Sequence, residues 1–221
     1  MKKLTIGIGL VFLVVGVALS INFTAFNRAF YTNTQIKYNI ADDVNLNQEE
    51  VDKVMGVLLD YLEDKRDDLD YTLTTGQQAF NQREIDHMVD VKVLYQNLML
   101  FIYVFGAVLL IVLVGYFVKK QSLTTLLDNY LKSTMIFMVI LVLIIGYALI
   151  DFNSFWIAFH ELVFTNDLWL LNPATDLLIN LVPEPLFFDL VFRIIVNSVL
   201  FIVVTNIVAR LVLIRLRRKY D

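Results

Sequence analysis

The chain has 221 residues, and its composition is that of a protein embedded in a membrane. Apolar residues make up 58% of it, charged residues only 18%, and the mean hydropathy is +0.66. Because an average soluble domain carries about 25% charged residues, this balance excludes a disordered chain and a nucleic-acid-binding protein, and it argues against a soluble globule. The lack of Cys excludes disulfides, thiolate nucleophiles and iron–sulfur clusters. The formal charge is −4, and its distribution along the chain matters more than its size.

Four apolar stretches are long enough to cross a bilayer, for which about 20 residues are needed. We expect spans at residues 4–22, 97–118, 134–151 and 190–214. The first stretch also has features of a signal peptide, because Lys2 and Lys3 precede it and Ala18-Leu19-Ser20 resembles a cleavage site. Its apolar run is longer than that of a usual signal peptide and continues without a turn, which favours a retained anchor.

Lys and Arg residues near the ends of the spans predict that both termini lie in the cytoplasm. In this orientation the N-terminus, the loop 119–133, the inner end of the last span and the tail 215–221 hold ten of the 18 bases and two of the 22 acids. The outer side then holds eight bases and 20 acids. The sequence therefore predicts an all-α membrane protein, one domain over residues 1–221, with an acidic outer face.

The outer segment 23–96 is expected to form a mainly helical cap. It begins with a piece rich in Asn, Thr and Tyr that looks extended, and it then has helical periodicity from Gln48 to about Lys65. Asn81, followed three residues later by Glu84, is typical of a capping box at a helix start. We expect that helix to continue through His87 into the second span.

The second outer segment, 152–189, is as apolar as a span but is interrupted by Asn-Pro and Pro-Glu-Pro sequences. Such a composition is typical of short helices in the membrane interface, where Trp and Phe are enriched. Asn172 before Pro173 is a start signal for one of these helices. We therefore expect an interfacial helical segment directly before the last span.

The two histidines, His87 and His160, are the candidates for acid–base chemistry, and both fall on the predicted outer side. A helix would place His160 on one side with Trp156 and Phe164, so a buried histidine with satisfied nitrogens is the plainer interpretation. An interfacial His with a perturbed pKa is, however, a ready general acid or base. His87 has Glu84 and Asp86 beside it, which also suits a solvated helix face.

A metal site is the less favoured interpretation of the same residues. Glu84-x-x-His87 is half of a di-iron motif, which requires a second pair and two further Glu residues. Nothing approaches His-Glu-x-x-His. A site made of His87, His160 and a carboxylate is the alternative, but we expect neither a metal nor another cofactor.

Further polar residues are expected to support a site on the outer side. Arg193 begins the last span, where an ionisable group is functional by default although snorkelling is the alternative. Asn166 and Asp167 lie inside an aromatic run that includes Trp169, and they either cap a helix or line a polar pocket. The sequence offers no nucleophile of its own, which suits a substrate that brings the nucleophile while the protein moves protons.

Three stretches resemble the signature of a family of bacterial four-span membrane proteins. They are FHELVFTNDLWLLNP at 159–173, PEPLFF at 183–188 and EIDHMVDVK at 84–92. The resemblance covers the whole chain, and the family includes the lipoprotein intramolecular transacylase of Gram-positive bacteria. It implies a multi-pass protein of the bacterial plasma membrane whose active site faces outward.

The resemblance also implies a substrate and a reaction. The substrate is a diacylglyceryl-modified lipoprotein, whose sn-2 acyl chain moves to the α-amine of its N-terminal Cys to give a lyso-form lipoprotein. The catalytic pair maps onto His160 and His87. We expect His160 to be the principal base and His87 to assist, with Glu84 or Asp86 fixing the tautomer of His87. Arg193, Asn166, Asp167 and Trp169 are expected to bind substrate or support the site.

The expected partners are lipoproteins and membrane lipid, without nucleic acid, and we expect a monomer. Two rival hypotheses are a metal-dependent membrane hydrolase and a non-enzymatic membrane sensor or assembly protein.

Overall fold

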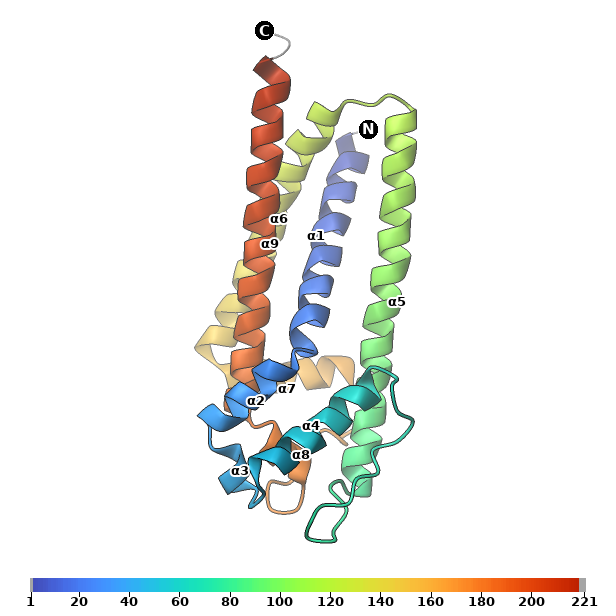
Figure 1. Cartoon of the computed structure of the whole chain (residues 1–221). Coiled ribbons are helices and arrows are strands. Elements are labelled where there is room, and N and C mark those ends of the chain that lie inside the picture. Colours follow the sequence, from blue (N-terminus) through green and yellow to red (C-terminus); the bar gives the residue numbers. More distant parts are fainter. Residues whose placement is uncertain (1, 219–221) are drawn as a thin grey trace. The chain divides into compact units, whose positions relative to one another are not determined.

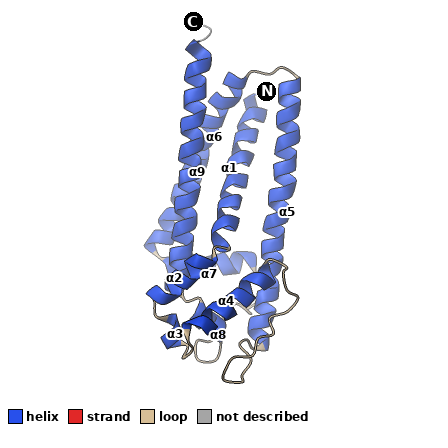
Figure 2. Ribbon diagram, in the orientation of Figure 1, coloured by secondary structure: helices blue, strands red, loops and turns tan. Residues whose placement is uncertain are grey.

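The structure is a computed structural model that describes residues 2–218, and within these residues it is all helix and loop (Figure 2). The predicted all-α class is confirmed. Figure 1 labels the helices, which are α1 Lys2–Ala25, α2 Arg28–Lys37, α3 Ile40–Asp43, α4 Gln48–Leu62, α5 Gln82–Val118, α6 Leu123–Ile150, α7 Phe152–Val163, α8 Leu177–Leu181 and α9 Glu184–Arg218. Lys219 and Asp221, which the orientation argument counts in the tail, lie outside the described residues.

Four of these helices, α1, α5, α6 and α9, are long and apolar enough to cross a membrane, and each overlaps one of the stretches expected to do so. The chain is a multi-pass membrane protein. It divides into two compact units. The span unit comprises, within the described chain, residues 2–23, 98–150 and 193–218, and the loop unit comprises residues 24–97 and 151–192.

Within the span unit, α1, α6 and α9 share a buried cluster formed by Leu13, Tyr130, Ile202 and Ala209. Polar side chains add hydrogen bonds between these helices, which matter in a bilayer because lipid offers polar groups no other partners. Asn206 of α9 donates through Nδ2 to Tyr130 Oη at 3.3 Å and to Thr134 Oγ1 at 3.2 Å on α6.

The approach of α1 to α6 is close because Gly9 has no side chain. A Cβ atom at Gly9 would lie 2.5 Å from Ser133 Oγ and 3.2 Å from the Tyr130 Cα atom. Ser133 cannot move away without loss, since the one proton of its hydroxyl is shared between the Ile6 carbonyl at 2.9 Å and the Asn129 carbonyl at 2.8 Å. Small residues of this kind allow helices in membranes to pack closely.

The loop unit differs from the sequence expectation at its start. The piece expected to be extended is helical, forming α2 and α3. Asn27 caps α2 by accepting a hydrogen bond from the Phe30 amide at 3.1 Å. The prediction was wrong because the polar residues of α2 concealed a buried face, which consists of Phe30, Tyr31, Thr34 and Gln35. The expected helix from Gln48 to about Lys65 is confirmed as α4.

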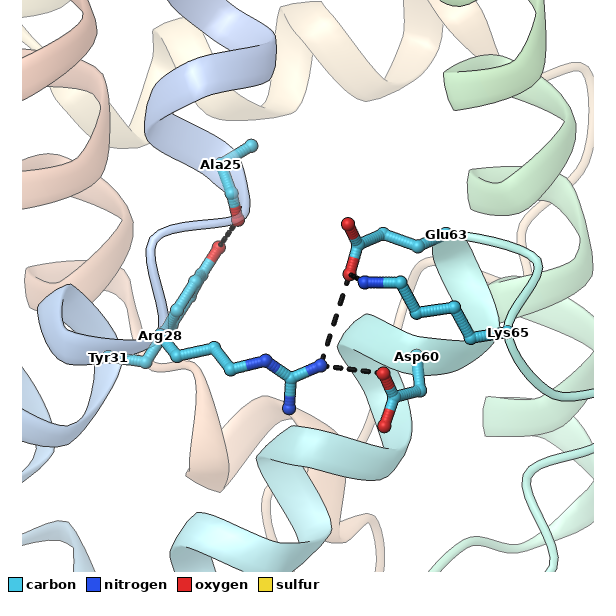
Figure 3. A network of polar contacts seen from close by, with 6 residues as sticks. All are labelled: Ala25, Arg28, Tyr31, Asp60, Glu63 and Lys65. Carbon is cyan, nitrogen blue, oxygen red and sulfur yellow. Dashed lines mark hydrogen bonds and ion pairs between the residues drawn. The ribbon is translucent and has the colours of Figure 1, made fainter.

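An ion-pair network joins α2 to the C-terminal end of α4 (Figure 3). Arg28 Nη2 lies 2.6 Å from Asp60 Oδ1 and 3.9 Å from Glu63 Oε2, and Lys65 Nζ also pairs with Glu63, at 2.7 Å. On the same helix as Arg28, the Tyr31 hydroxyl donates to the Ala25 carbonyl at 2.8 Å. These exposed pairs are worth little individually, and their effect is to fix where α2 meets α4.

We expect Gly9→Val to destabilise the span unit, because the added carbon atoms cannot be placed without displacing α6. Overpacking of this kind costs about 1–3 kcal/mol. The matched control is Gly7→Val, since a Cβ atom at Gly7 meets nothing within 4 Å. Thermal unfolding in detergent, followed by circular dichroism, should show a lower midpoint for Gly9→Val alone. Equal midpoints for the two variants would contradict the close α1–α6 packing.

Candidate active site

The position of His87 follows from the way α5 begins. Asn81 Oδ1 accepts from the Glu84 amide at 3.2 Å, and Glu84 Oε2 accepts from the Asn81 amide at 2.8 Å. This is the reciprocal capping box that the sequence predicted. It sets the first turn of α5, so His87 follows Glu84 one turn later on the same face.

The second oxygen of Glu84 connects α5 to α8. Glu84 Oε1 accepts from the Leu178 amide at 2.6 Å, and the Glu84 side chain is 1% exposed. Next to it, Asn81 Nδ2 donates to Asp176 Oδ1 at 2.8 Å. Burial raises the pKa of Glu84, while the backbone amides around it act in the opposite direction. A single buried carboxylate therefore holds the start of two helices.

The expected helix start at Asn172 was wrong. The described chain turns there, and α8 begins only at Leu177. Asn172 Oδ1 accepts from the Ala174 amide at 3.0 Å, and the Asn172 amide donates to Asp176 Oδ2 at 2.7 Å. Both hydrogen bonds close a turn, which is the known alternative to helix capping for an Asn side chain.

His160 is positioned by α7, which has its own capping residue. Asp151 accepts from the Ser154 amide at 3.0 Å and from the Ser154 hydroxyl at 2.6 Å. From this start, Asn153, Trp156 and His160 follow at helical spacing along one face, and all three line the same cavity.

The two imidazoles face each other within the loop unit. Their ring centroids are 6.3 Å apart with an interplanar angle of 35°, and His87 and His160 are 8% and 7% exposed. Other rings of the described chain surround His160 at centroid distances of 4.6–5.7 Å, namely those of Trp156, Trp169, Phe159 and Phe164. The predicted pair of histidines is therefore brought together in an aromatic enclosure.

A backbone contact fixes the tautomer of His160. Its Nδ1 lies 2.8 Å from the carbonyl oxygen of Trp156. Because a carbonyl oxygen only accepts, Nδ1 must carry the proton. In the neutral ring, the lone pair then lies on Nε2, which is the nitrogen that can take a proton from another molecule.

His87 is held differently. In the part of the chain that the structure describes, its buried Nδ1 has no hydrogen-bond partner. Burial lowers the pKa of His87 to about 4, the charge of His160 adds to this effect, and the charge of Asp90 opposes it. Burial also lowers the pKa of His160, against the effect of its bond to Trp156. Both rings are therefore neutral near pH 7 and able to accept protons.

The histidines line a cavity of about 420 Å³ inside the loop unit. Apolar side chains from several elements form most of its wall, including Met55 and Leu58 of α4, Val91 of α5, Leu178 of α8 and Phe187 of α9. Five polar or titratable residues interrupt this wall, namely Tyr31, His87, Asn153, His160 and Glu184. A space of this size and character is typical of a site for an apolar ligand.

The loop after α7 carries three of the expected supporting residues. Trp169 stacks on His160 with a centroid distance of 4.8 Å, and its indole Nε1 donates to the Asn166 carbonyl at 3.0 Å. Asn166 Nδ2 donates to Asp90 Oδ2 at 2.8 Å. Asp167 forms an ion pair with Arg83, whose guanidinium also donates to the Asp167 carbonyl. These contacts tie the loop to α5, so it both supports His160 and encloses the site.

The remaining expected residues have other surroundings. Glu84 is bonded to backbone amides, and Asp86 accepts from Gln82 Nε2 at 2.8 Å, so neither is seen orienting His87. Arg193 belongs to the span unit, where it is exposed. Within residues 2–218 no three or more His, Asp or Glu side chains are grouped so that they could hold a metal ion.

Some residues of the site were not singled out by sequence reasoning. Arg83 and Asp90 anchor the loop after α7, and Asn153 and Glu184 line the cavity, with Asn153 Nδ2 3.2 Å from Glu184 Oε2. The helical spacing of Asn153 with Trp156 and His160 is a signal that could have identified Asn153. Glu184 had no such signal, because its neighbours come from distant parts of the sequence.

The chain is similar to a known protein family and to solved structures of membrane proteins. A sequence model described as "Lipoprotein intramolecular transacylase Lit" matches residues 6–188. The in meso structure of the membrane integral lipoprotein intramolecular transacylase Lit from Bacillus cereus is 23% identical, with a TM-score of 0.80 over 99% of this chain and 98% of that chain. Two variants of that protein, each with one His replaced, are 22% (Arg variant) and 20% (Ala variant) identical, both with a TM-score of 0.77. They cover 100% and 99% of this chain and 95% and 96% of their own. No match was found among curated proteins.

We expect Glu84→Gln to destabilise the loop unit. An amide has one acceptor oxygen where the carboxylate has two, so a buried backbone N–H loses its partner at a cost of about 1–3 kcal/mol. The control is Asp86→Asn, which alters a contact at the helix surface and should change stability by less than about 0.5 kcal/mol. Tryptophan fluorescence reports on this unit alone, because both Trp residues, Trp156 and Trp169, belong to it. Unchanged unfolding of Glu84→Gln would contradict the bridging role.

Proposed function

Because this chain belongs to the lipoprotein intramolecular transacylase family and is therefore an acyltransferase, we propose that it transfers the sn-2 acyl chain of a diacylglyceryl lipoprotein to the α-amine of the N-terminal Cys of the same molecule. The product is a lyso-form lipoprotein. Nucleophile and acyl donor belong to one substrate, so the protein needs only to orient them and to move a proton.

The observation that carries this proposal is the tautomer of His160 and its position at the cavity. Its Nδ1–H is committed to the Trp156 carbonyl, and its ring is buried beside His87 at one apolar cavity. A neutral imidazole in this tautomer presents Nε2 as the base. We assign to it the removal of the proton that the neutral amine gives up as it attacks, after the ammonium form, whose free pKa is about 7.7–8.0, has released its extra proton to solvent.

The reaction balances without water or a cofactor. The amine nitrogen forms a bond to the ester carbonyl carbon, and the bond from that carbon to the glyceryl oxygen breaks. The proton that leaves the nitrogen passes to His160 Nε2 and is returned to the departing glyceryl oxygen. One residue thus acts first as a base and then as an acid.

His87 is proposed as the assisting group. Its lowered pKa makes it a weaker base than an ordinary histidine, which agrees with a secondary role. Its Nδ1 lacks a partner within the described residues, and an unpaired buried nitrogen costs stability unless a ligand meets it. We propose that this nitrogen contacts the substrate when the cavity is occupied.

The apolar cavity is proposed to take the acyl chain that moves. Each buried methylene contributes about 0.8 kcal/mol to binding, so part of one long chain supplies much of the affinity. The apolar wall also keeps water from the ester, and a site that admitted water would release a fatty acid in place of the transfer. We propose that Trp169 supports this enclosure, that Asn166 and Asp167 fix the loop that carries it, and that Arg193 contacts a carbonyl of the substrate.

We expect His160→Ala to lower the formation of lyso-form lipoprotein by roughly 10²–10⁴-fold, the usual effect of losing a positioned acid or base. His87→Ala should reduce it severely. The measurement is mass spectrometry of a lipoprotein N-terminus from cells that make each variant, because N-acylation distinguishes product from substrate. Arg193→Leu should lower conversion about tenfold or more if the guanidinium binds substrate.

The matched control for these variants is Glu161→Gln, an exposed neighbour of His160 that lines neither described cavity. It should leave conversion unchanged. Addition of EDTA should also leave conversion unchanged, whereas a metal-dependent hydrolase would lose activity. A folded His160→Ala protein that still makes N-acylated, monoacylglyceryl product would overturn the proposal.

We further propose that the protein lies in the bacterial plasma membrane with both termini inside and the loop unit on the outer face, and that it acts as a monomer. Because the chain contains no Cys, single cysteines report on topology. Thr75→Cys, in the loop unit, should react with a membrane-impermeant maleimide in intact cells, and Thr125→Cys, at the start of α6, should not. Both side chains are exposed. The reverse pattern would place the histidines on the cytoplasmic side.

A further inference from the structure

The loop unit contains a second, smaller cavity of about 150 Å³ between α5 and the loop that follows α7. Its eight lining residues are Asp90, Val93, Leu94, Asn97, Val163, Phe164, Thr165 and Asn166. Half of these carry polar side chains, in contrast to the apolar wall of the larger cavity. With roughly a third of the volume of the larger cavity, the space suits a small polar group and not a long acyl chain.

The two cavities share part of their walls. Leu94 and Phe164 line both of them. The Phe164 ring lies 5.3 Å from the His87 ring and 5.7 Å from the His160 ring, measured between centroids. The polar cavity therefore adjoins the larger one beside the two imidazoles.

Asp90 supplies the negative charge of the smaller cavity. It follows His87 by one turn of α5 and lies on the same face, and its Oδ2 holds the Asn166 amide at 2.8 Å. The negative charge of Asp90 acts on the imidazole of His87, since it raises the pKa of His87 while burial lowers it. Arg83, one turn before His87 on α5, pairs instead with Asp167.

We propose, on the basis of the function proposed above, that the smaller cavity receives the free α-amine and the first peptide group of the lipoprotein, with Asp90 as the partner of the amine. The larger cavity then holds the acyl chain, and the ester lies between them, beside the histidines. The site selects diacylglyceryl peptides that still have an unmodified α-amine.

The chemistry of the transfer favours a carboxylate at this position. The free α-amine is mostly protonated near pH 7, so Asp90 binds it as a cation. The ammonium releases one proton to solvent before the chemical step. Attack of the neutral amine on the ester then places positive charge on nitrogen again, and a fixed carboxylate stabilises that charge where it develops. His160 takes this second proton and delivers it to the glyceryl oxygen. The side-chain amides of Asn97 and Asn166 suit peptide N–H and C=O groups, which every peptide carries whatever its sequence.

The experiment measures binding without turnover. Two synthetic lipopeptides carry dialkylglyceryl ethers in place of the esters, so that no acyl transfer occurs, and they differ only in a free or an acetylated α-amine. Wild-type protein in nanodiscs should bind the free amine about tenfold or more tightly, as expected for a charge-assisted hydrogen bond. Asp90→Asn should reduce this ratio to about one, although its side-chain oxygen can still accept from Asn166. Glu161→Gln removes the same charge at an exposed site and should keep the wild-type ratio.

A second variant keeps the test decisive if Asp90→Asn does not fold. Thr165→Cys creates the only thiol of the chain, and a maleimide attached there fills the smaller cavity. Labelling should abolish the preference for the free amine, while the unlabelled variant keeps it. Equal binding of both lipopeptides by wild-type protein, or a preference that survives Asp90→Asn or labelling, would overturn the subsite and leave the proposed function intact. Binding of neither lipopeptide would overturn the proposed function and the subsite with it.

Discussion

The buried carboxylate of Glu84 fixes the geometry on which the rest of the loop unit depends. One oxygen completes the cap of α5, and the other accepts from the first turn of α8. The rotation of α5 about its axis determines the direction of the His87 side chain, and the position of α8 determines where Leu178 lines the cavity. A buried carboxylate is costly unless it is fully hydrogen-bonded, and here backbone amides meet both oxygens. The site is thus built on a contact between residues 94 positions apart in the sequence.

Burial serves opposite purposes at Glu84 and at the histidines. Glu84 is surrounded by fixed donors, which offset the cost of keeping it out of water. His87 and His160 are surrounded mainly by rings, and burial there lowers the pKa of both, so that neither carries a charge near pH 7. Neutral imidazoles keep an apolar cavity free of an unpaired charge. They also remain able to accept a proton, which a histidine already protonated in the resting state could not do.

The sequence predicted the features that depend on local pattern. Length and apolarity identified the four spanning helices, the periodicity after Gln48 identified α4, and the Asn81–Glu84 spacing identified the cap of α5. Features that depend on tertiary contacts were missed. The buried face of α2 lies among polar residues. Asn is favoured both in turns and at helix N-caps, so the residue type at position 172 could not distinguish the two. The two cavities, and with them the places of Glu184 in the larger and Asp90 in the smaller, arise from segments that no local pattern connects.

The two units of the molecule use polar groups according to their surroundings. In the span unit, hydroxyls and amides such as those of Tyr130 and Asn206 bond to one another across helices, because lipid offers them no alternative partner. In the loop unit, polar side chains such as those of His87 and Asn153 line a cavity, and the buried Nδ1 of His87 has no partner within the described residues. An intramolecular acyl transfer requires this second arrangement, since its reactants arrive together and the protein contributes orientation, a base and the exclusion of water. In the proposed function, two neutral histidines in an aromatic enclosure meet these needs without a nucleophile from the protein, and the proposed role of Asp90 adds a negative charge beside them where the amine loses its protons.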